Sequence, residues 1–174
     1  MQLIHDFGIS PTEYEKRGMD NEFPEVESCP KCSYPGPFPK HGFYWRNAVF
    51  SKRSLRIPIC RYKCPSCQKT ISILPDFLLP HYQHALVLIL WVLEEYLKSS
   101  CKKTYRQLLQ FYLKRYYKNL NRIKAFLREL GFYEKIPKKE KAIKLLEMIH
   151  SAFPKAKTFA KRFQEHFHRN FMAN

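Results

Sequence analysis

The chain has 174 residues, of which 45% are hydrophobic and 16% aromatic, and its net charge is +16. This apolar content excludes a chain too polar to fold. The longest apolar run, residues 85–93, is shorter than the roughly 20 residues that a transmembrane helix needs. The positive charge favours a polyanionic partner, nucleic acid before a membrane surface. Because no secretory signal is visible at the start, we expect the protein in the cytoplasm, a reducing compartment.

Residues 1–28 are expected to form an acidic N-terminal arm. They carry seven acidic residues and two basic ones, whereas no acidic residue occurs from residue 28 through residue 75. Two interpretations of this arm are open. It folds back over a surface meant for phosphate, or it is a solvated leader that packs loosely.

Two Cys-x-x-Cys turns follow the arm, Cys29-Pro30-Lys31-Cys32 and Cys64-Pro65-Ser66-Cys67. Each turn directs two sulfurs into one site, and four thiolates in a closed tetrahedron suit a structural Zn²⁺. The sequence therefore predicts Zn²⁺ bound by Cys29, Cys32, Cys64 and Cys67. The alternatives are two disulfides or four unrelated buried thiols; the doubled motif and the reducing compartment favour the metal.

The residues between the two turns, 33–63, are predicted to form a β-hairpin. β-Branched and aromatic residues place strands at about 41–46, 55–63 and 70–74, with a basic turn at 47–54. Residues 29–76 are thus predicted to be a small zinc ribbon with a three-stranded antiparallel sheet. Pro58 inside the second strand indicates an edge position or a bulge. Such a small sheet buries little apolar area, so zinc would supply much of its folding free energy.

Cations alternate with aromatic residues in this ribbon. The cations expected to contact phosphate are Arg46, Lys52, Arg53, Arg56, Arg61 and Lys63. The aromatic residues Phe43, Trp45 and Tyr62 leave a second interpretation open, in which they stack on the unpaired bases of RNA or another single strand.

Further cysteines and histidines are interpreted as non-ligands. Cys60 and His41 are expected to be strand residues, because the four turn cysteines already complete a zinc shell. His81 and His84 have the i, i+3 spacing of a metal pair, but no second pair accompanies them. Cys101 lies beside Lys102 and Lys103, but no base to pair with it is visible, and we assign no catalytic residue.

Residues 77–133 are predicted to be helical and to resemble a helix-turn-helix. A buried helix is expected at 81–98, and a capping box at Thr104–Gln107 would open a second helix. A third helix would start at Asn119 as N-cap and end at Gly131. Its outer face would enter the major groove of DNA through Asn121, Arg122, Lys124 and Arg128. An ordinary solvated basic face is the alternative.

Residues 134–174 are predicted to form basic C-terminal helices, one from about 138 to 153 and, after Pro154, another to about 171. Phe159, Phe163 and Phe167 recur every four residues in the second helix. Such a helix can lie on a membrane surface. We expect this stripe instead to dock on the preceding helices.

The segments Arg61–Ser72 and Lys40–Arg46 resemble the zinc ribbons at the front of insertion-sequence transposases. In those ribbons an aromatic and a basic residue precede the second cysteine turn, a short strand follows it, and a helix-turn-helix commonly comes next. The resemblance covers about residues 29–131. It implies a bacterial, nucleoid-associated DNA-binding protein of α+β fold, with a zinc ribbon followed by an all-α bundle. Those transposases continue into a catalytic domain with carboxylates that hold Mg²⁺, and the residues after Gly131 show no such framework.

These features together predict a zinc-dependent DNA-binding protein that is a transposase-related accessory or regulator and not an enzyme. DNA is the expected partner, RNA is the second, and transposition proteins are further candidates. The alternatives are an RNA or single-strand binder, and a non-catalytic fragment of a transposase.

Overall fold

The computed structural model describes residues 1–99, 106–133, 136–137, 140–152 and 156–174, and these form two compact units, Met1–Ala85 and Leu86–Asn174. The first unit is a sheet with a short helix, and the second is helical, so the predicted α+β class is confirmed. The predicted boundaries at residues 28, 76 and 133 do not coincide with this division. Some predicted features lie outside the described residues. They are Cys101, the start of the capping box at Thr104 and Tyr105, and the helix limits at 138 and 153–154.

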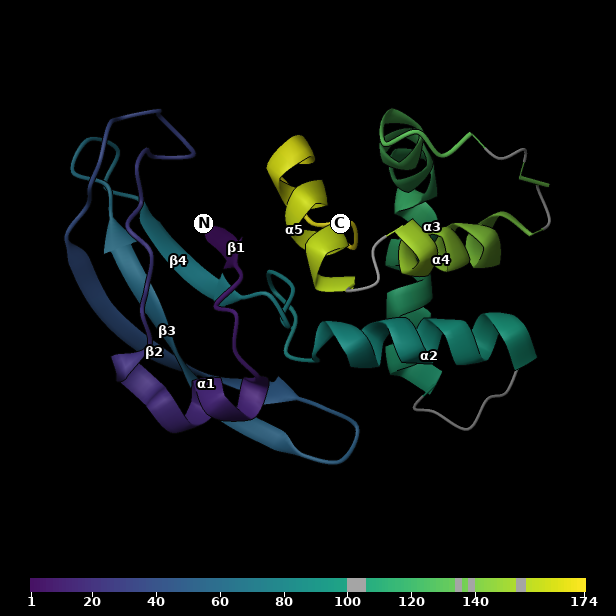
Figure 1. The fold of residues 1–174 in the computed structure, drawn as a ribbon, viewed down its shortest axis with the longest axis horizontal. Coiled ribbons are helices and arrows are strands. Elements are labelled where there is room, and N and C mark those ends of the chain that lie inside the picture. The colour runs from purple at the N-terminus through teal and green to yellow at the C-terminus, as the bar shows by residue number, and fades with distance from the viewer. Residues whose placement is uncertain (100–105, 134–135, 138–139, 153–155) are drawn as a thin grey trace. The chain divides into compact units, whose positions relative to one another are not determined.

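The first unit contains four strands and two short helices (Figure 1). In chain order they are β1 (Gln2–His5), α1 (Pro11–Arg17), the 3-10 helix η1 (Gly18–Asp20), β2 (Lys40–Val49), β3 (Ser54–Lys63) and β4 (Thr70–Pro75). The predicted hairpin between the cysteine turns is β2 and β3. The turn that connects them is residues 50–53, shorter than the predicted 47–54, because β2 continues to Val49 and β3 already begins at Ser54.

The sheet has the order β1-β4-β3-β2, so the prediction of a three-stranded antiparallel sheet is wrong. The fourth strand, β1, pairs in parallel with β4, with Leu3 opposite Ile73. Met1 extends the pairing, since its carbonyl accepts from Ser72 N–H at 2.8 Å. The first residues of the acidic arm thus cover the backbone edge of β4 that would otherwise remain unpaired.

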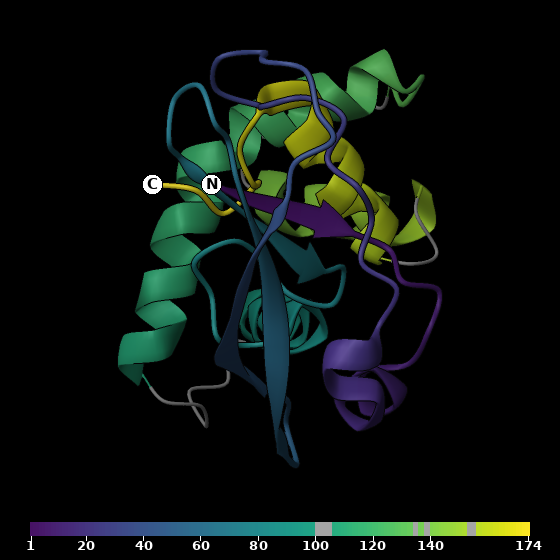
Figure 2. The ribbon, with the colours of Figure 1, turned by 90° about the vertical axis from the view of Figure 1, so that its left-hand side faces the viewer.

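Helix α1 covers a second exposed edge. Only the last residues of β3, Arg61 to Lys63, pair with β4, and the rest of the hairpin extends beyond it, with α1 alongside (Figure 2). The Tyr14 hydroxyl donates to the Pro58 carbonyl at 3.0 Å, and the Glu15 carboxylate accepts from the Arg56 backbone N–H at 2.9 Å. Pro58 therefore lies where β3 has no strand partner on the side of α1. At such an edge position, as predicted, its missing N–H breaks no ladder of strand hydrogen bonds.

Two apolar clusters hold this unit together. One gathers around Tyr14, which is fully buried with Ile57, Ile59 and Leu74. The other includes Ile71, Tyr62 and two of the turn cysteines, Cys29 and Cys64. Phe23, from the acidic arm, packs against both clusters. Residues 1–28 are therefore part of the folded unit, and neither a loose leader nor a separate arm describes them.

The second unit contains α2 (Leu86–Ser99), α3 (Arg106–Glu129), α4 (Lys141–Ala152) and α5 (Ala156–Phe167). Figure 1 shows α3 running across α2 and α4. Helix α2 begins later than predicted, because residues 76–85 form turns and short bridges instead. It is also less enclosed than predicted, since Val87 and Trp91 are exposed.

The predicted break before Asn119 does not exist, so the helix-turn-helix over residues 104–131 is wrong. Helix α3 is continuous for 24 residues, and Asn119 is fully buried in its middle. The Asn119 amide donates to the carbonyls of Arg115 at 2.9 Å and Ala173 at 2.8 Å, while its oxygen accepts from Arg122. Because these hydrogen bonds pair the side chain of Asn119 inside the helix, this asparagine does not have to lie at a helix terminus.

The predicted end of this helix at Gly131 is confirmed. Gly131 has a φ of +91° and donates to the Arg128 carbonyl at 2.9 Å, while Phe132 N–H reaches the Leu127 carbonyl at 3.0 Å. This pair of bonds is the Schellman motif, in which glycine accepts the left-handed conformation at little cost.

The aromatic stripe of α5 docks inside this unit, as expected. Phe159 and Phe163 are fully buried, and both contact Phe126 of α3, with ring centroids 5.9 and 5.5 Å away. Phe167 and Phe171 complete the cluster. Among the described helices, none combines the length and the hydropathy that crossing a membrane requires.

Candidate metal centre

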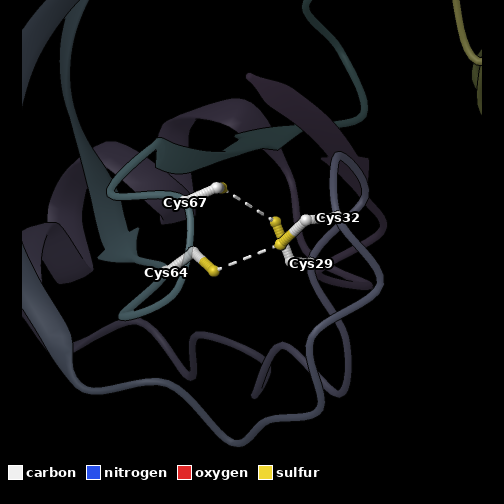
Figure 3. Close-up of side chains that lie close together, drawn as sticks. All are labelled: Cys29, Cys32, Cys64 and Cys67. Carbon is white, nitrogen blue, oxygen red and sulfur yellow. Dashed lines mark hydrogen bonds between the residues drawn. The ribbon is translucent and has the colours of Figure 1, made fainter.

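The four turn cysteines converge on one point, as Figure 3 shows. Their sulfur atoms all lie within 4.8 Å of one another, and the Cys29–Cys67 and Cys32–Cys64 sulfur pairs are each 3.7 Å apart. A metal with bonds of about 2.3 Å to four thiolates places the sulfurs about 3.8 Å apart at the corners of a tetrahedron. All four are free thiols. This arrangement could hold a metal ion.

The two turns are built alike. In each turn the first cysteine accepts at its carbonyl from the residue four positions on, at 2.8 Å for Ser33 and 3.0 Å for Gln68. Its N–H donates to the residue five positions on, Tyr34 or Lys69. Ser33 and Gln68 both have left-handed backbones, with φ of +57° and +58°. Neither position was predicted from the sequence, although each follows the first cysteine of its turn by four residues.

The surroundings of the four sulfurs favour the thiolate form at one of them, Cys29. Burial is the largest influence on Cys29 and raises its pKa, but hydrogen bonds from the backbone N–H groups of Cys32 and Lys31 and from neighbouring thiols lower the pKa to about 6. At Cys67 a backbone bond from Lys69 lowers the pKa, whereas burial and the other three thiols raise it to about 11. A bound cation would favour the thiolate form at all four sulfurs.

The left-handed turn residues give a direct test of this construction. Ser33→Gly should leave the stability of the first unit unchanged or raise it by up to about 1 kcal/mol, because glycine adopts a positive φ without the steric cost of a Cβ. Ser33→Val should lower it by at least about 1 kcal/mol. Urea unfolding of the metal-loaded protein measures both. Equal destabilisation by the two substitutions would contradict a left-handed Ser33.

Other candidate ligands lie outside this centre. Cys60 is buried in β3 beside Tyr62, and burial raises the pKa of its thiol. His41 is exposed at the irregularity between Lys40 and Gly42 in β2. Within the described part of the chain, the turn cysteines are the one group of three or more ligand side chains close enough to share a metal.

The cations predicted to bind phosphate on the ribbon occupy different environments. The guanidinium of Arg46 donates to the backbone carbonyls of Leu79 and Tyr82, so it ties β2 to the chain that follows the sheet. Arg53 donates to the Thr12 hydroxyl at 2.5 Å, and Arg61 lies 5.8 Å from the centre of the Tyr44 ring. The remaining three are Lys52 and Arg56, which are exposed, and Lys63, which is partly exposed.

The four residues predicted for a recognition helix all lie on α3. Arg122 bonds to Asn119, and Asn121 accepts from Lys141 of α4 at 2.5 Å. Lys124 is partly exposed and Arg128 exposed. The ribbon cations belong to the first unit and these four residues to the second.

A family described as a domain of unknown function, DUF6431, matches residues 29–116, just over half of the chain. The chain belongs to the DUF6431 family. The DUF6431 match begins at Cys29, so it includes the four cysteines, β2 to β4, α2 and the first half of α3. No curated protein and no solved structure matches the chain.

Proposed function

We propose that this protein is a zinc-dependent DNA-binding protein without catalytic activity of its own. The observation that carries the proposal is the division of charge between its units. The first unit has 11 lysines and arginines against eight acids, a net of +3, whereas the helical unit has 20 against seven, a net of +13. A charge of +13 on a small folded unit attracts a polyanion, and a duplex carries one negative charge per about 1.7 Å.

Zinc is proposed as the ion because four thiolates in a closed tetrahedron suit Zn²⁺, and an isolated iron is the competing fit. Four sulfur ligands leave no open position for water, so the role of the metal would be structural. It would fix two loops against a sheet that is small for independent stability. Removal of the metal would weaken DNA binding, because the exposed cations of the ribbon would no longer be held on a folded surface.

A transposase-related accessory or regulator is the biological role that we propose, in a bacterial cell and on its nucleoid. The resemblance of the cysteine turns and the hairpin to transposase ribbons supports this role. Transposition proteins would then be its protein partners. This role would be tested by whether genes for transposition proteins lie beside the genes of DUF6431 members.

Salt dependence tests the electrostatic proposal. The metal-loaded full-length protein should bind a mixed-sequence DNA duplex, and its affinity should fall by about 10³-fold between about 50 and 200 mM salt if about six phosphates are contacted. Fluorescence anisotropy of a labelled duplex measures this. No binding, or an affinity that does not change with salt, would contradict the proposal.

The second candidate function is single-strand or RNA binding, and one residue favours it. Trp45 of β2 is 50% exposed, and the Arg56 guanidinium lies 5.8 Å from its ring centre. An exposed indole beside a cation is a platform for an unpaired base. The other predicted platforms are engaged, since Tyr62 is buried and Phe43 packs on the core. If single strands outcompete the duplex and Trp45→Ala abolishes that preference, this candidate replaces the first.

A further inference from the structure

The centre line of the outward face of α3 carries no acidic side chain. Exposed residues recur along it at helical spacing, every three or four positions. The residues along its centre are Gln110, Lys114, Lys118, Asn121, Ala125 and Arg128. The one carboxylate of α3 is Glu129 in its last turn, which pairs with His166 of α5 at 3.2 Å. Gln107 shares the angular position of Ala125, and the half-exposed Tyr117 lies beside Arg128, so this face offers cations, amides, one small residue and one aromatic ring to a partner.

The edges of this face also carry cations. At about 100° per residue, Arg115 and Arg122 lie along one edge, and Lys124 lies along the other. Arg115 is stacked 3.6 Å from the Phe111 ring centre, and Arg122 is held by the buried Asn119. Lys141 of α4 adds a cation on the side of Asn121. Positive charge thus flanks the amide-bearing centre on both sides.

We propose that α3 binds duplex DNA by lying in its major groove, with this face towards the base edges. The proposal rests on the function proposed above. It keeps the major groove expected from the sequence and extends the contact along the whole of the unbroken α3, to Lys114 and Lys118. The 24 residues of α3 span about 36 Å, and a helix about 10–12 Å across fits a major groove about 12 Å wide. Phosphates border a groove on both sides, which matches cations along both edges of the helix.

The centre of the face carries the side chains that read bases. Arg128 has the fork that pairs with guanine, and Asn121 has the amide that pairs with adenine. Ala125 lies between them in sequence and permits close approach or contact with a thymine methyl group. Duplex RNA is excluded as the preferred partner, because its major groove is too narrow for a helix.

The test compares two double variants of the metal-loaded full-length protein. Lys114→Ala with Lys118→Ala removes two cations from the α3 face, and Lys161→Ala with Arg162→Ala removes two from α5. Both leave the same net charge. The α3 variant should lose at least about 10-fold in affinity for a mixed-sequence DNA duplex, and the slope of log K against log salt should fall by about 2. The α5 variant should change the slope by less than about 1.

Far-UV circular dichroism should show that both variants remain helical. Equal loss in the two variants would overturn the α3 assignment while leaving general DNA binding intact. Absence of binding by the wild type would overturn the proposed function itself. Duplex RNA competing as well as duplex DNA would also overturn the groove assignment.

Base reading has a separate measurement. Selection from a pool of random-sequence duplexes should enrich a motif with the wild type, and Asn121→Ala should lose the preference at one position, typically about 5- to 100-fold. An unchanged motif would remove Asn121 from the reading surface.

Discussion

Replacing Cys64 with serine should unfold the first unit and leave the helical unit folded. Cys64 is fully buried, and its sulfur lies 3.7 Å from that of Cys32. A serine hydroxyl is a poor metal ligand in place of the Cys64 thiolate. Structural zinc contributes about 10–16 kcal/mol to the folding of small domains. A sheet of four strands with two modest apolar clusters cannot replace that contribution. Bound metal, measured by elemental analysis, should fall well below one equivalent.

The two tryptophans separate the units in this experiment, since Trp45 lies in the first and Trp91 in the second. In a Trp91→Phe background, the fluorescence of Trp45 reports the first unit alone. Cys60→Ala in that background is the matched control, because Cys60 is equally buried but lies outside the cluster of four cysteines. It should keep one equivalent of metal and lose about 1 kcal/mol. Wild-type protein that binds no metal, or a Cys64→Ser variant that unfolds like the wild type, would refute the metal centre.

Tyr14→Ala should destabilise the first unit by about 3–5 kcal/mol. Tyr14 is fully buried, with its ring centre 4.8 Å from that of Phe7 and 5.8 Å from that of Phe77. Its loss would leave a cavity in the apolar cluster around Ile57, Ile59 and Leu74 and an unpaired carbonyl at Pro58. Urea unfolding followed by Trp45 fluorescence, again with Trp91→Phe, measures the change.

Tyr14→Phe is the control for the hydroxyl. It keeps the ring and removes the 3.0 Å hydrogen bond to the Pro58 carbonyl, which should cost about 1 kcal/mol. If Tyr14→Ala changed stability by less than about 0.5 kcal/mol, residues 1–28 would not contribute to the core as the structure indicates.

The convergence of the four cysteines and the hairpin were predictable because their signals are local. A Cys-x-x-Cys turn fixes its own two sulfurs, and the doubled motif left few alternatives for the four. The strand β1 was not predictable in this way. Gln2 pairs with Ser72, 70 positions away, and the seven acidic residues of residues 1–28 gave that segment the composition of a solvated leader.

The helix break at Asn119 was predicted from a preference that tertiary contacts overrode. Asparagine favours helix starts because its side chain can bond to free backbone N–H groups. In the structure that side chain instead donates to the carbonyl of Ala173, 54 positions on. No local pattern could indicate this partner, so one long helix was interpreted as two short ones.

The cover that α1 provides along β3 matters for anyone who produces fragments of this family. A piece cut at the limits of the DUF6431 match, residues 29–116, would lack both β1 and α1 and would stop midway through α3. Bare strand edges on β3 and β4 would then invite edge-to-edge association between copies. Insoluble material from such a piece would reflect its chosen ends rather than any instability of the whole protein.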